Sequence, residues 1–154
     1  MSSCLQRRVR PLARAKFEMP DDFLSALSKL EARTDEIVPK VLQAGGEVVL
    51  ESVRDHLQAV VGVGTKYPSR TTGELINALG VSGARLDRRG NMTVKVGFRE
   101  PRRSGNSNAQ LGNILEHGKS GQPPKPFLKP ARIASHAACI ERMRQVFEAE
   151  VAKI

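Results

Sequence analysis

A proline-rich segment in the C-terminal half of the chain constrains the fold more than any other feature. The sequence NILEHGKSGQPPKPFLKPA, residues 113–131, holds four of the nine prolines. Proline fixes its own φ angle and lacks the N–H group that helices and inner strands require. The chain must therefore pass from one helical pattern to the next through a stiff, extended connection.

Apolar residues at helical spacing predict two helices in the N-terminal part of the chain. A short helix is expected over residues 20–30, and a long one from an N-cap at Thr34 to about residue 61. Pro39 is then expected near the start of the long helix, because a proline deeper inside would break or kink it. The pair Gly45-Gly46 is expected to mark a kink or a tight contact.

The middle of the chain predicts a loop, a short helix and two strands. The loop covers residues 62–70, and Thr72 is expected to cap a short helix over residues 73–79. Residues 81–98 are expected to form two strands around the turn at residues 88–91. The second strand alternates, with one face made of Met92, Val94, Val96 and Phe98.

Two further helices complete the predicted elements. Gly118 is expected to stop a short helix over residues 109–115, and the last helix runs from about residue 130 to 152. The last helix carries an apolar stripe that suits packing on a sheet or on a partner helix; it consists of Ile133, Ala137, Ile140, Met143, Phe147 and Val151. The predicted fold class is α+β, with a long N-terminal helix and a C-terminal helix packed on a small, mostly antiparallel sheet with a β-hairpin.

Charge is distributed unevenly along the chain. The formal net charge is +9, yet residues 19–61 carry four basic and eight acidic residues, while residues 62–132 carry thirteen basic and four acidic ones. Opposite patches on one small protein can set the register of neighbouring copies in a head-to-tail ring. The alternative is a basic nucleic-acid-binding module, whose candidate contacts are Arg88, Arg89, Arg99, Arg102 and Arg103.

Other composition features narrow the function classes. A single Tyr and the lack of Trp argue against a stacking platform for single strands. The longest apolar runs are far shorter than the roughly 20 residues of a membrane span. The two cysteines make no disulfide framework, which fits a reducing compartment.

No set of residues in the sequence predicts catalysis or cofactor binding. The three histidines have no cysteine or carboxylate at the spacing of a metal site. The stretch GVGTK, residues 62–66, lacks the spacing and the following helix of a phosphate loop. We therefore expect a protein without enzyme activity, cofactor or metal.

The first 18 residues are interpreted as an extension of the domain. They are basic and show no clear period, whereas Met19 opens a stretch with good helix-entry chemistry, in which Pro20 precedes two aspartates. We expect residues 1–18 to be a basic, disordered extension and residues 19–154 to be the functional domain.

Two stretches resemble a phage protein family. YPSRTTGELINAL, residues 67–79, is similar to a Pro…Thr-Gly-x-Leu pattern, and ILEHGKSGQPPKPFLKPA, residues 114–131, resembles a Leu-Glu-aromatic-Gly…Pro-Phe-Leu-x-Pro-Ala signature. Both patterns belong to the small lambdoid siphophage and prophage head–tail joining proteins, also called neck or tail-completion proteins. The resemblance covers residues 19–154 in order and length. His117 and Ala78 depart from it, since an aromatic residue and Ser are common at these places.

The resemblance implies a structural role in virion assembly. The chain would form a ring with copies of itself in the head–tail connector, or the tail terminator that caps the tail tube. Its partners would be other phage neck and tail proteins, with DNA contact only as channel passage and no membrane. It would act in the bacterial host cytoplasm and then remain in the virion. The implied interface candidates are Tyr67, Thr72, Gly73, Leu75, Glu116, Gly118, Pro123, Pro124, Pro126, Phe127, Leu128 and Pro130.

The apolar tip of the proline-rich segment has two possible roles. Phe127 and Leu128 can anchor the segment on a neighbouring subunit, as compact apolar residues do at interfaces. They can also pin the last helix to the core of their own chain, since a buried Phe usually belongs to the core. The two roles are compatible with each other.

Overall fold

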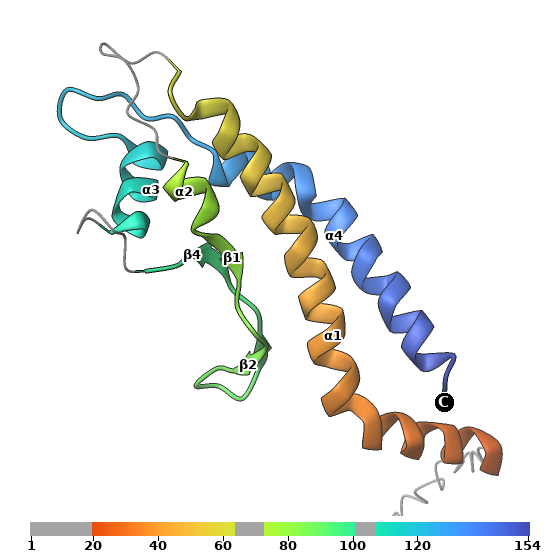
Figure 1. Cartoon of the computed structure of the whole chain (residues 1–154). Coiled ribbons are helices and arrows are strands. Elements are labelled where there is room, and N and C mark those ends of the chain that lie inside the picture. Colours follow the sequence, from red (N-terminus) through yellow and green to blue (C-terminus); the bar gives the residue numbers. More distant parts are fainter. Residues whose placement is uncertain (1–19, 64–72, 101–106) are drawn as a thin grey trace, which may run out of the picture.

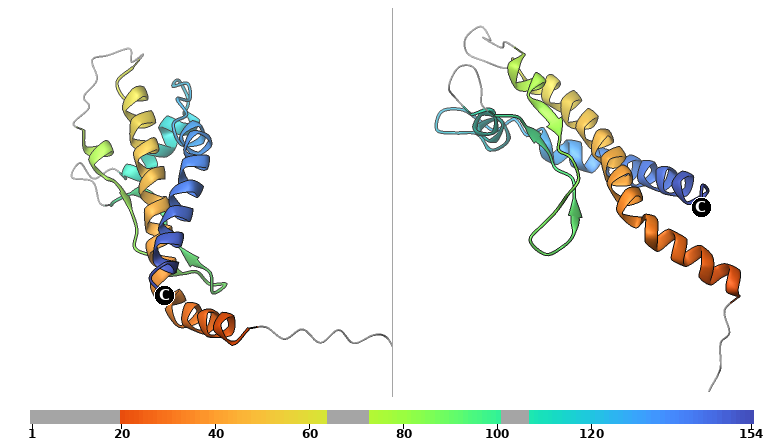
Figure 2. Two further views of the ribbon diagram at one scale, coloured as in Figure 1. Left: turned by 90° about the vertical axis from the view of Figure 1, so that its right-hand side faces the viewer. Right: turned by 60° about the horizontal axis from the view of Figure 1, so that its bottom comes forward.

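The computed structural model describes residues 20–63, 73–100 and 107–154. Two long helices, α1 and α4, lie side by side, and the short helices and strands gather along one side of this pair (Figures 1 and 2). The predicted α+β class is confirmed. In chain order the elements are α1 Asp21–Val60, α2 Glu74–Asn77, β1 Leu79–Val81, β2 Arg85–Leu86, β3 Met92–Thr93, β4 Val96–Phe98, α3 Asn108–His117 and α4 Leu128–Val151.

Helix α1 is a single helix of 40 residues, so the prediction of two helices was wrong. Thr34 is not an N-cap: its hydroxyl donates to the Leu30 carbonyl at 2.9 Å, one helical turn back. Pro39 lies well inside the helix, where it cannot donate to the carbonyl of Asp35 and crowds it. Helix α1 remains continuous but bends, and its first part turns away from the body (Figure 1).

The glycine pair in α1 marks a tight contact, as the sequence suggested. A Cβ atom on Gly45 would lie 2.7 Å from Cγ of Met143 in α4. A Cβ atom on Gly46 would lie 3.0 Å from Cγ1 atoms of both Val81 and Val94. The two glycines therefore let α1 approach α4 on one side and the strands on the other.

The strands form a twisted ribbon made of two short antiparallel pairs. Strand β1 pairs with β4, with Leu79 opposite Phe98, and β2 pairs with β3. Between the two pairs, Ser82 N–H donates to the Lys95 carbonyl at 2.8 Å, and Lys95 N–H donates to the Ser82 hydroxyl at 2.9 Å. The predicted second strand is thus interrupted between β3 and β4. There the Lys95 N–H donates to the Ser82 side chain instead of to a backbone carbonyl of the opposite strand.

The predicted turn of the hairpin is confirmed. Gly90 has a φ of 82°, which favours glycine. The Asp87 carboxylate accepts the N–H groups of Arg89 and Asn91, each at 2.8 Å. The first strand begins earlier than predicted, at Leu79, because α2 ends at Asn77. The N-cap position of α2 is Gly73, and the predicted cap Thr72 lies outside the described residues.

Helix α3 matches its prediction, and α4 begins slightly earlier than expected. The Ser107 hydroxyl accepts the N–H of Gln110 at 3.1 Å, and α3 ends at the C-cap Gly118. Helix α4 starts at Leu128, so Pro130 lies within its first turn. A proline is tolerated there because the first N–H groups of a helix have no intrahelical acceptor.

The face that α4 packs on α1 differs from the predicted stripe. Ser52 of α1 donates to the Ala131 carbonyl at 3.1 Å, and Cys139 lies against Gly45. The prediction was wrong in part, because small residues, which permit close approach of two helices, carry no apolar signal in the sequence. Of the predicted stripe, Met143 packs against Gly45 and Val151 is half-buried, whereas Ile133, Ile140 and Phe147 remain exposed by 66%, 47% and 43%.

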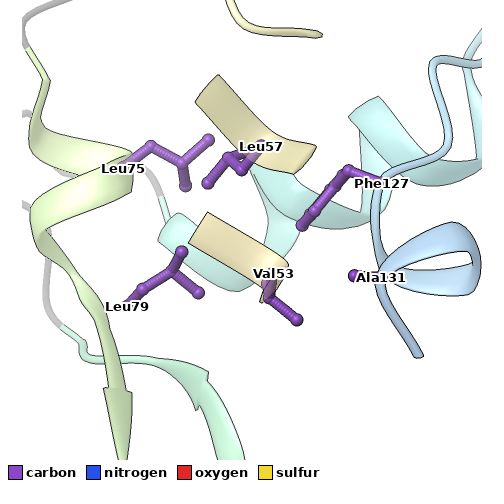
Figure 3. Packing of buried hydrophobic residues seen from close by; sticks show 6 residues of the cluster. All are labelled: Val53, Leu57, Leu75, Leu79, Phe127 and Ala131. Atoms are coloured by element: carbon purple, nitrogen blue, oxygen red, sulfur yellow. The ribbon is translucent and has the colours of Figure 1, made fainter. Parts of the chain in front are cut away.

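The core lies between α1, α2, β1 and the start of α4. Figure 3 shows Leu57 between Leu75 of α2 and Phe127, which directly precedes α4. The Phe127 ring is fully buried and meets Phe98 edge to face, with ring centroids 6.3 Å apart. The buried cluster consists of Val53, Leu57, Leu75, Leu79, Phe127 and Ala131.

Candidate functional site

The Glu116 carboxylate joins the end of α3 to the start of α4. It accepts the N–H groups of Phe127 at 2.7 Å, Leu128 at 2.8 Å and Lys129 at 3.1 Å. The N-cap residue of α4 supplies no side-chain hydrogen bond of its own. Glu116 therefore acts as the cap from outside the helix, and its negative charge also suits the positive end of the helix dipole.

The environment of Glu116 favours its charged form. Partial burial acts to raise the pKa of Glu116, but the hydrogen bonds from Leu128, Phe127 and Lys129 outweigh it and lower the pKa below the usual 4.5. Neighbouring His117 lowers the pKa further. Glu116 is thus an ionised cap at neutral pH, with its oxygens committed to α4.

Gly118 lets the chain fold back after α3. It has a φ of 77°, and a Cβ atom there would lie 2.8 Å from the Gln122 carbonyl oxygen and 2.9 Å from the nitrogen of Pro124. Only glycine fits this place without strain. Lys125 N–H then donates to the Leu115 carbonyl at 2.7 Å. The segment from Gly118 to Phe127, which we call the α3–α4 connection, is therefore fixed at both ends.

The predicted site residues occupy different environments. Leu75 and Phe127 are core residues, so the two sequence motifs meet in one hydrophobic cluster (Figure 3). Gly73 lies at the start of α2 with a φ of 72°. Pro130 is half-buried, and the exposed members are Pro123, Pro124, Pro126 and Leu128. Tyr67 and Thr72 lie outside the described residues.

A groove lies beside the α3–α4 connection. It has a volume of about 430 Å³ and an apolar floor from α1, β1 and β4, with Leu128 of α4 at its border. Its polar lining groups include Asn113, His117 and Arg132. An apolar groove with a polar border suits an apolar group of a binding partner. In the part of the chain that the structure describes, no cluster of His, Cys, Asp or Glu could hold a metal ion.

The first part of α1 has almost no packing partner among the described residues, which was not predicted from the sequence. Residues 21–36, which we call the α1 arm, are all exposed except half-buried Leu30. The arm projects past the C-terminal end of α4 (Figure 2). A sequence signal existed: between Leu30 and Ile37 no large apolar residue occurs, so the buried face of the helix is interrupted there.

The apolar side of the α1 arm borders a small hollow of about 180 Å³. Within the described residues, Val151 at the end of α4 and Ile154 just beyond it are its lining residues from elsewhere in the chain. The hollow is lined by Phe23, Ala26, Leu27, Leu30, Val151 and Ile154. Phe23, Leu24 and Leu27 nevertheless remain 51%, 46% and 44% exposed.

The charged side chains form separate surfaces. Glu47, Glu51 and Asp55 recur every four residues along α1, and all three are exposed. The hairpin exposes its arginines at positions 85, 88 and 89. Arg99 lies at the other end of the strand ribbon, where its N–H bonds the Ala78 carbonyl at 2.7 Å. The candidate nucleic-acid arginines are therefore not one patch, and Arg102 and Arg103 lie outside the described residues.

Comparison with known proteins identifies the family. A family model described as "Bacteriophage HK97-gp10, putative tail-component" matches residues 21–118. No curated protein and no solved structure matches the chain. In the described ranges no helix is long and apolar enough to cross a membrane. The family match runs from the start of α1 to the C-cap of α3 and includes most of the core. The chain therefore belongs to the HK97-gp10-like family of phage tail components, in agreement with the head–tail joining motifs in its sequence.

Proposed function

We propose that this protein is a subunit of the ring that completes the phage tail and joins it to the head. Membership of the family makes it a structural component of phage particles. The ring, its place at the head–tail junction and the residues that form its contacts are the proposal. Exposed Pro123, Pro124, Pro126 and Leu128 would contact the neighbouring protein. Buried Phe127, together with half-buried Glu116 and Gly118, would hold them in place.

The observation that carries the proposal is that acidic and basic side chains without an ion-pair partner in the described structure lie on two different surfaces of the molecule. Glu47, Glu51 and Asp55 are exposed along α1, and the arginines at positions 85, 88 and 89 are exposed on the hairpin. Within the described residues none of these six side chains forms an ion pair. A subunit in a head-to-tail ring presents two different surfaces to identical neighbours, and opposite charge on those surfaces favours one register.

The proposal is tested by joining heads and tails in vitro. Filled heads and separately assembled tails from a phage that lacks this protein are mixed, and joined particles are counted by electron microscopy. Adding the protein is expected to restore joining. Reversing the charge of the α1 surface with Glu47→Lys, Glu51→Lys and Asp55→Lys is expected to reduce joining strongly. If the protein does not restore joining, the proposed place at the head–tail junction is wrong.

A matched set of variants tests the charge argument itself. Arg85→Glu, Arg88→Glu and Arg89→Glu together are expected to reduce joining as well. Mixing this hairpin variant with the α1 variant is expected to recover part of the activity, because each can then meet an opposite charge on its neighbour. Joining that survives both reversals would show that these surfaces take no part in it.

The tail terminator remains the alternative within the same class. The two roles differ in the particles that form when the protein is missing. Loss of a joining protein leaves tails of normal length without heads, whereas loss of a terminator leaves tails of uncontrolled length. Tail lengths in the same micrographs therefore separate the two functions.

A further inference from the structure

We propose that the α1 arm of one copy packs on the exposed face of α4 in a second copy. This inference rests on the proposed function, because it names a contact through which copies of the chain associate. We call the exposed face of α4, made of Ile133, Ile140 and Phe147, the α4 stripe. Both surfaces lack a cover in the described part of the chain.

The α1 arm gains little stability from packing within the described part of its own chain. Its residues are exposed except half-buried Leu30, although helices in proteins are stabilised mainly by packing of an apolar face. Its apolar residues lie on one side, since Phe23, Leu27 and Leu30 are spaced by four and three residues. Among the described residues, only Val151 at the end of α4 and Ile154 beyond it line this side from elsewhere in the chain. An uncovered apolar side on a projecting helix indicates a contact with another molecule.

The α4 stripe has the geometry of a helix-binding surface. Ile133, Ile140 and Phe147 are spaced by seven residues, the repeat that keeps side chains facing a partner helix crossing at a shallow angle. The stripe spans 14 residues, or about 21 Å of helix. Residues 21–35 of the arm span the same length. The apolar residues of the arm, from Phe23 to Leu30, span about 10.5 Å, so one arm can cover about half of the stripe.

Charge favours the α1 arm as the occupant. The arm carries five acidic and two basic residues. The start of the α4 stripe is flanked by Lys125, Lys129 and Arg132, and all but half-buried Lys125 are exposed. An acidic amphipathic helix is thus the partner that suits this surface best. Because the arm projects past the end of its own α4 (Figure 2), it reaches only the last turn of that helix, and a second copy must supply the match.

Site-directed cross-linking tests this contact. In a background with Cys4→Ser and Cys139→Ala, one tagged chain carries Leu27→Cys and a second, differently tagged chain carries Ile140→Cys. The two chains are mixed, assembled on heads and tails, and oxidised. A disulfide requires Cβ atoms about 3.8 Å apart. A mixed dimer carrying both tags is expected, and it can form only between copies.

Ser25 provides the control because it lies on the opposite side of the arm from Leu27. Ser25→Cys mixed with Ile140→Cys is expected to give much less mixed dimer. Leu27→Glu and Ile140→Glu are each expected to weaken self-association by about tenfold or more, as one interface anchor does, whereas Ser25→Glu leaves it unchanged. Sedimentation of the purified chains measures this effect.

The outcomes separate this inference from the proposed function. If the cysteine-free parent joins heads to tails and Leu27→Cys cross-links no better than Ser25→Cys, the arm does not pack on the α4 stripe, and only this inference fails. If the mixed dimer forms but the parent joins nothing, the contact exists and the joining function is wrong. Unchanged self-association of both Glu variants also overturns the inference.

Discussion

Gly118 and Gly121 share a positive φ angle but differ in their surroundings. Their φ angles are 77° and 76°, so an alanine is strained at either place, and the ψ of 179° at Gly118 lies in a region that essentially only glycine adopts. Only at Gly118 would a Cβ atom also meet backbone, at 2.8 Å from the Gln122 carbonyl oxygen; at Gly121 nothing lies within 4 Å. Glycine is therefore required at position 118 for two reasons, the positive φ angle of the turn and the close backbone packing.

This pair gives a matched prediction. Gly121→Ala is expected to lower the free energy of unfolding by the strain alone, and Gly118→Ala by clearly more, because the α3–α4 connection must also move. Urea denaturation of both variants measures the difference. Equal losses would show that the connection relaxes freely around Gly118.

Phe127 and Leu128 are neighbours with opposite exposure. Phe127 is fully buried among residues of its own chain, whereas Leu128 is 41% exposed beside the groove. Phe127→Ala is expected to cost about 3–5 kcal/mol of folding free energy. Leu128→Ala is expected to change folding little and to reduce joining. Thermal melting and the joining assay check both variants, and a stable Phe127→Ala protein would contradict the burial of that ring.

Glu150 gives a prediction about pH. Its carboxylate forms ion pairs with Lys153 and with Lys40, the latter at 2.8 Å, and these hold the pKa of Glu150 at about 2, below the usual 4.5. Because the pKa is lower in the folded chain, Glu150 stabilises it above pH 4.5, and this contribution is lost as pH falls toward 2.

Glu150→Gln tests this dependence. The variant is expected to be less stable than the wild type at pH 7 and to approach it at pH 2. Glu148→Gln, which changes an exposed carboxylate two residues earlier on α4, serves as the control and is expected to show no such trend. Denaturation across pH measures the difference, and a constant gap between Glu150→Gln and the wild type would rule out the ion pairs as its cause.

At the scale of elements, the α3–α4 connection combines rigid backbone with an exposed surface. Pro123 and Pro124 are exposed, so their rings contribute little to the core. Replacing both with Gly is expected to leave the melting temperature nearly unchanged and to weaken joining, because docking must then remove added backbone freedom. The same preparations are measured by thermal melting and by the joining assay. Full joining with two glycines would mean that the rigidity of the connection is not used.

Much of the element order follows from the sequence, and the failures have physical reasons. The hairpin and α3 are encoded locally, by the turn at Gly90 and the stop at Gly118. Pro39 suggested a helix start, but the chain tolerates it inside α1 at the expense of a bend. The capping role of Glu116 could not be predicted from the sequence, because the accepting carboxylate lies on α3 and the N–H donors lie at the start of α4. The family motif located this place without showing its mechanism.

The packing of α4 illustrates the limit of apolar periodicity. Large residues at positions 133, 140 and 147 suggested the buried face, but α4 meets α1 through Ala131 at Ser52 and through Cys139 and Met143 at Gly45. The candidate interface was therefore found only in part from the sequence. Its most exposed surfaces, the α1 arm and the α4 stripe, could be identified only once the packing of α1 against α4 was known.

At the scale of the whole molecule, association is expected to depend on salt. Residues 19–61 carry eight of the 16 acidic residues and four basic ones, whereas residues 62–132 carry thirteen of the 25 basic residues and four acidic ones. Exposed charges are screened beyond about 8 Å at 0.15 M salt, so self-association is expected to weaken as salt rises. Sedimentation at increasing salt measures this. Association that is equal or stronger at 1 M salt would point to a purely apolar contact.

We also propose that residues 19–154 form the joining domain and that residues 1–18 are an extension dispensable for folding. The basic extension has no helical period in its sequence. Deleting residues 1–18 is expected to leave the melting temperature within about 5 °C of the full chain, a shift of roughly 1 kcal/mol at most. A larger drop in melting temperature would show that the extension packs on the domain.

The pairing of α1 with α4 also governs when the chain can fold during its synthesis. Ser52 bonds a residue 79 positions later, and Lys40 bonds one 110 positions later. Phe127 and Ala131, which complete the hydrophobic cluster, leave the ribosome only after α1, the strands and α3. A nascent chain that ends before them leaves Leu57 and Leu75 without their cover. Only a chain synthesised past Ala131 can therefore hold its shape, and products that terminate before it are left open to the host's proteases.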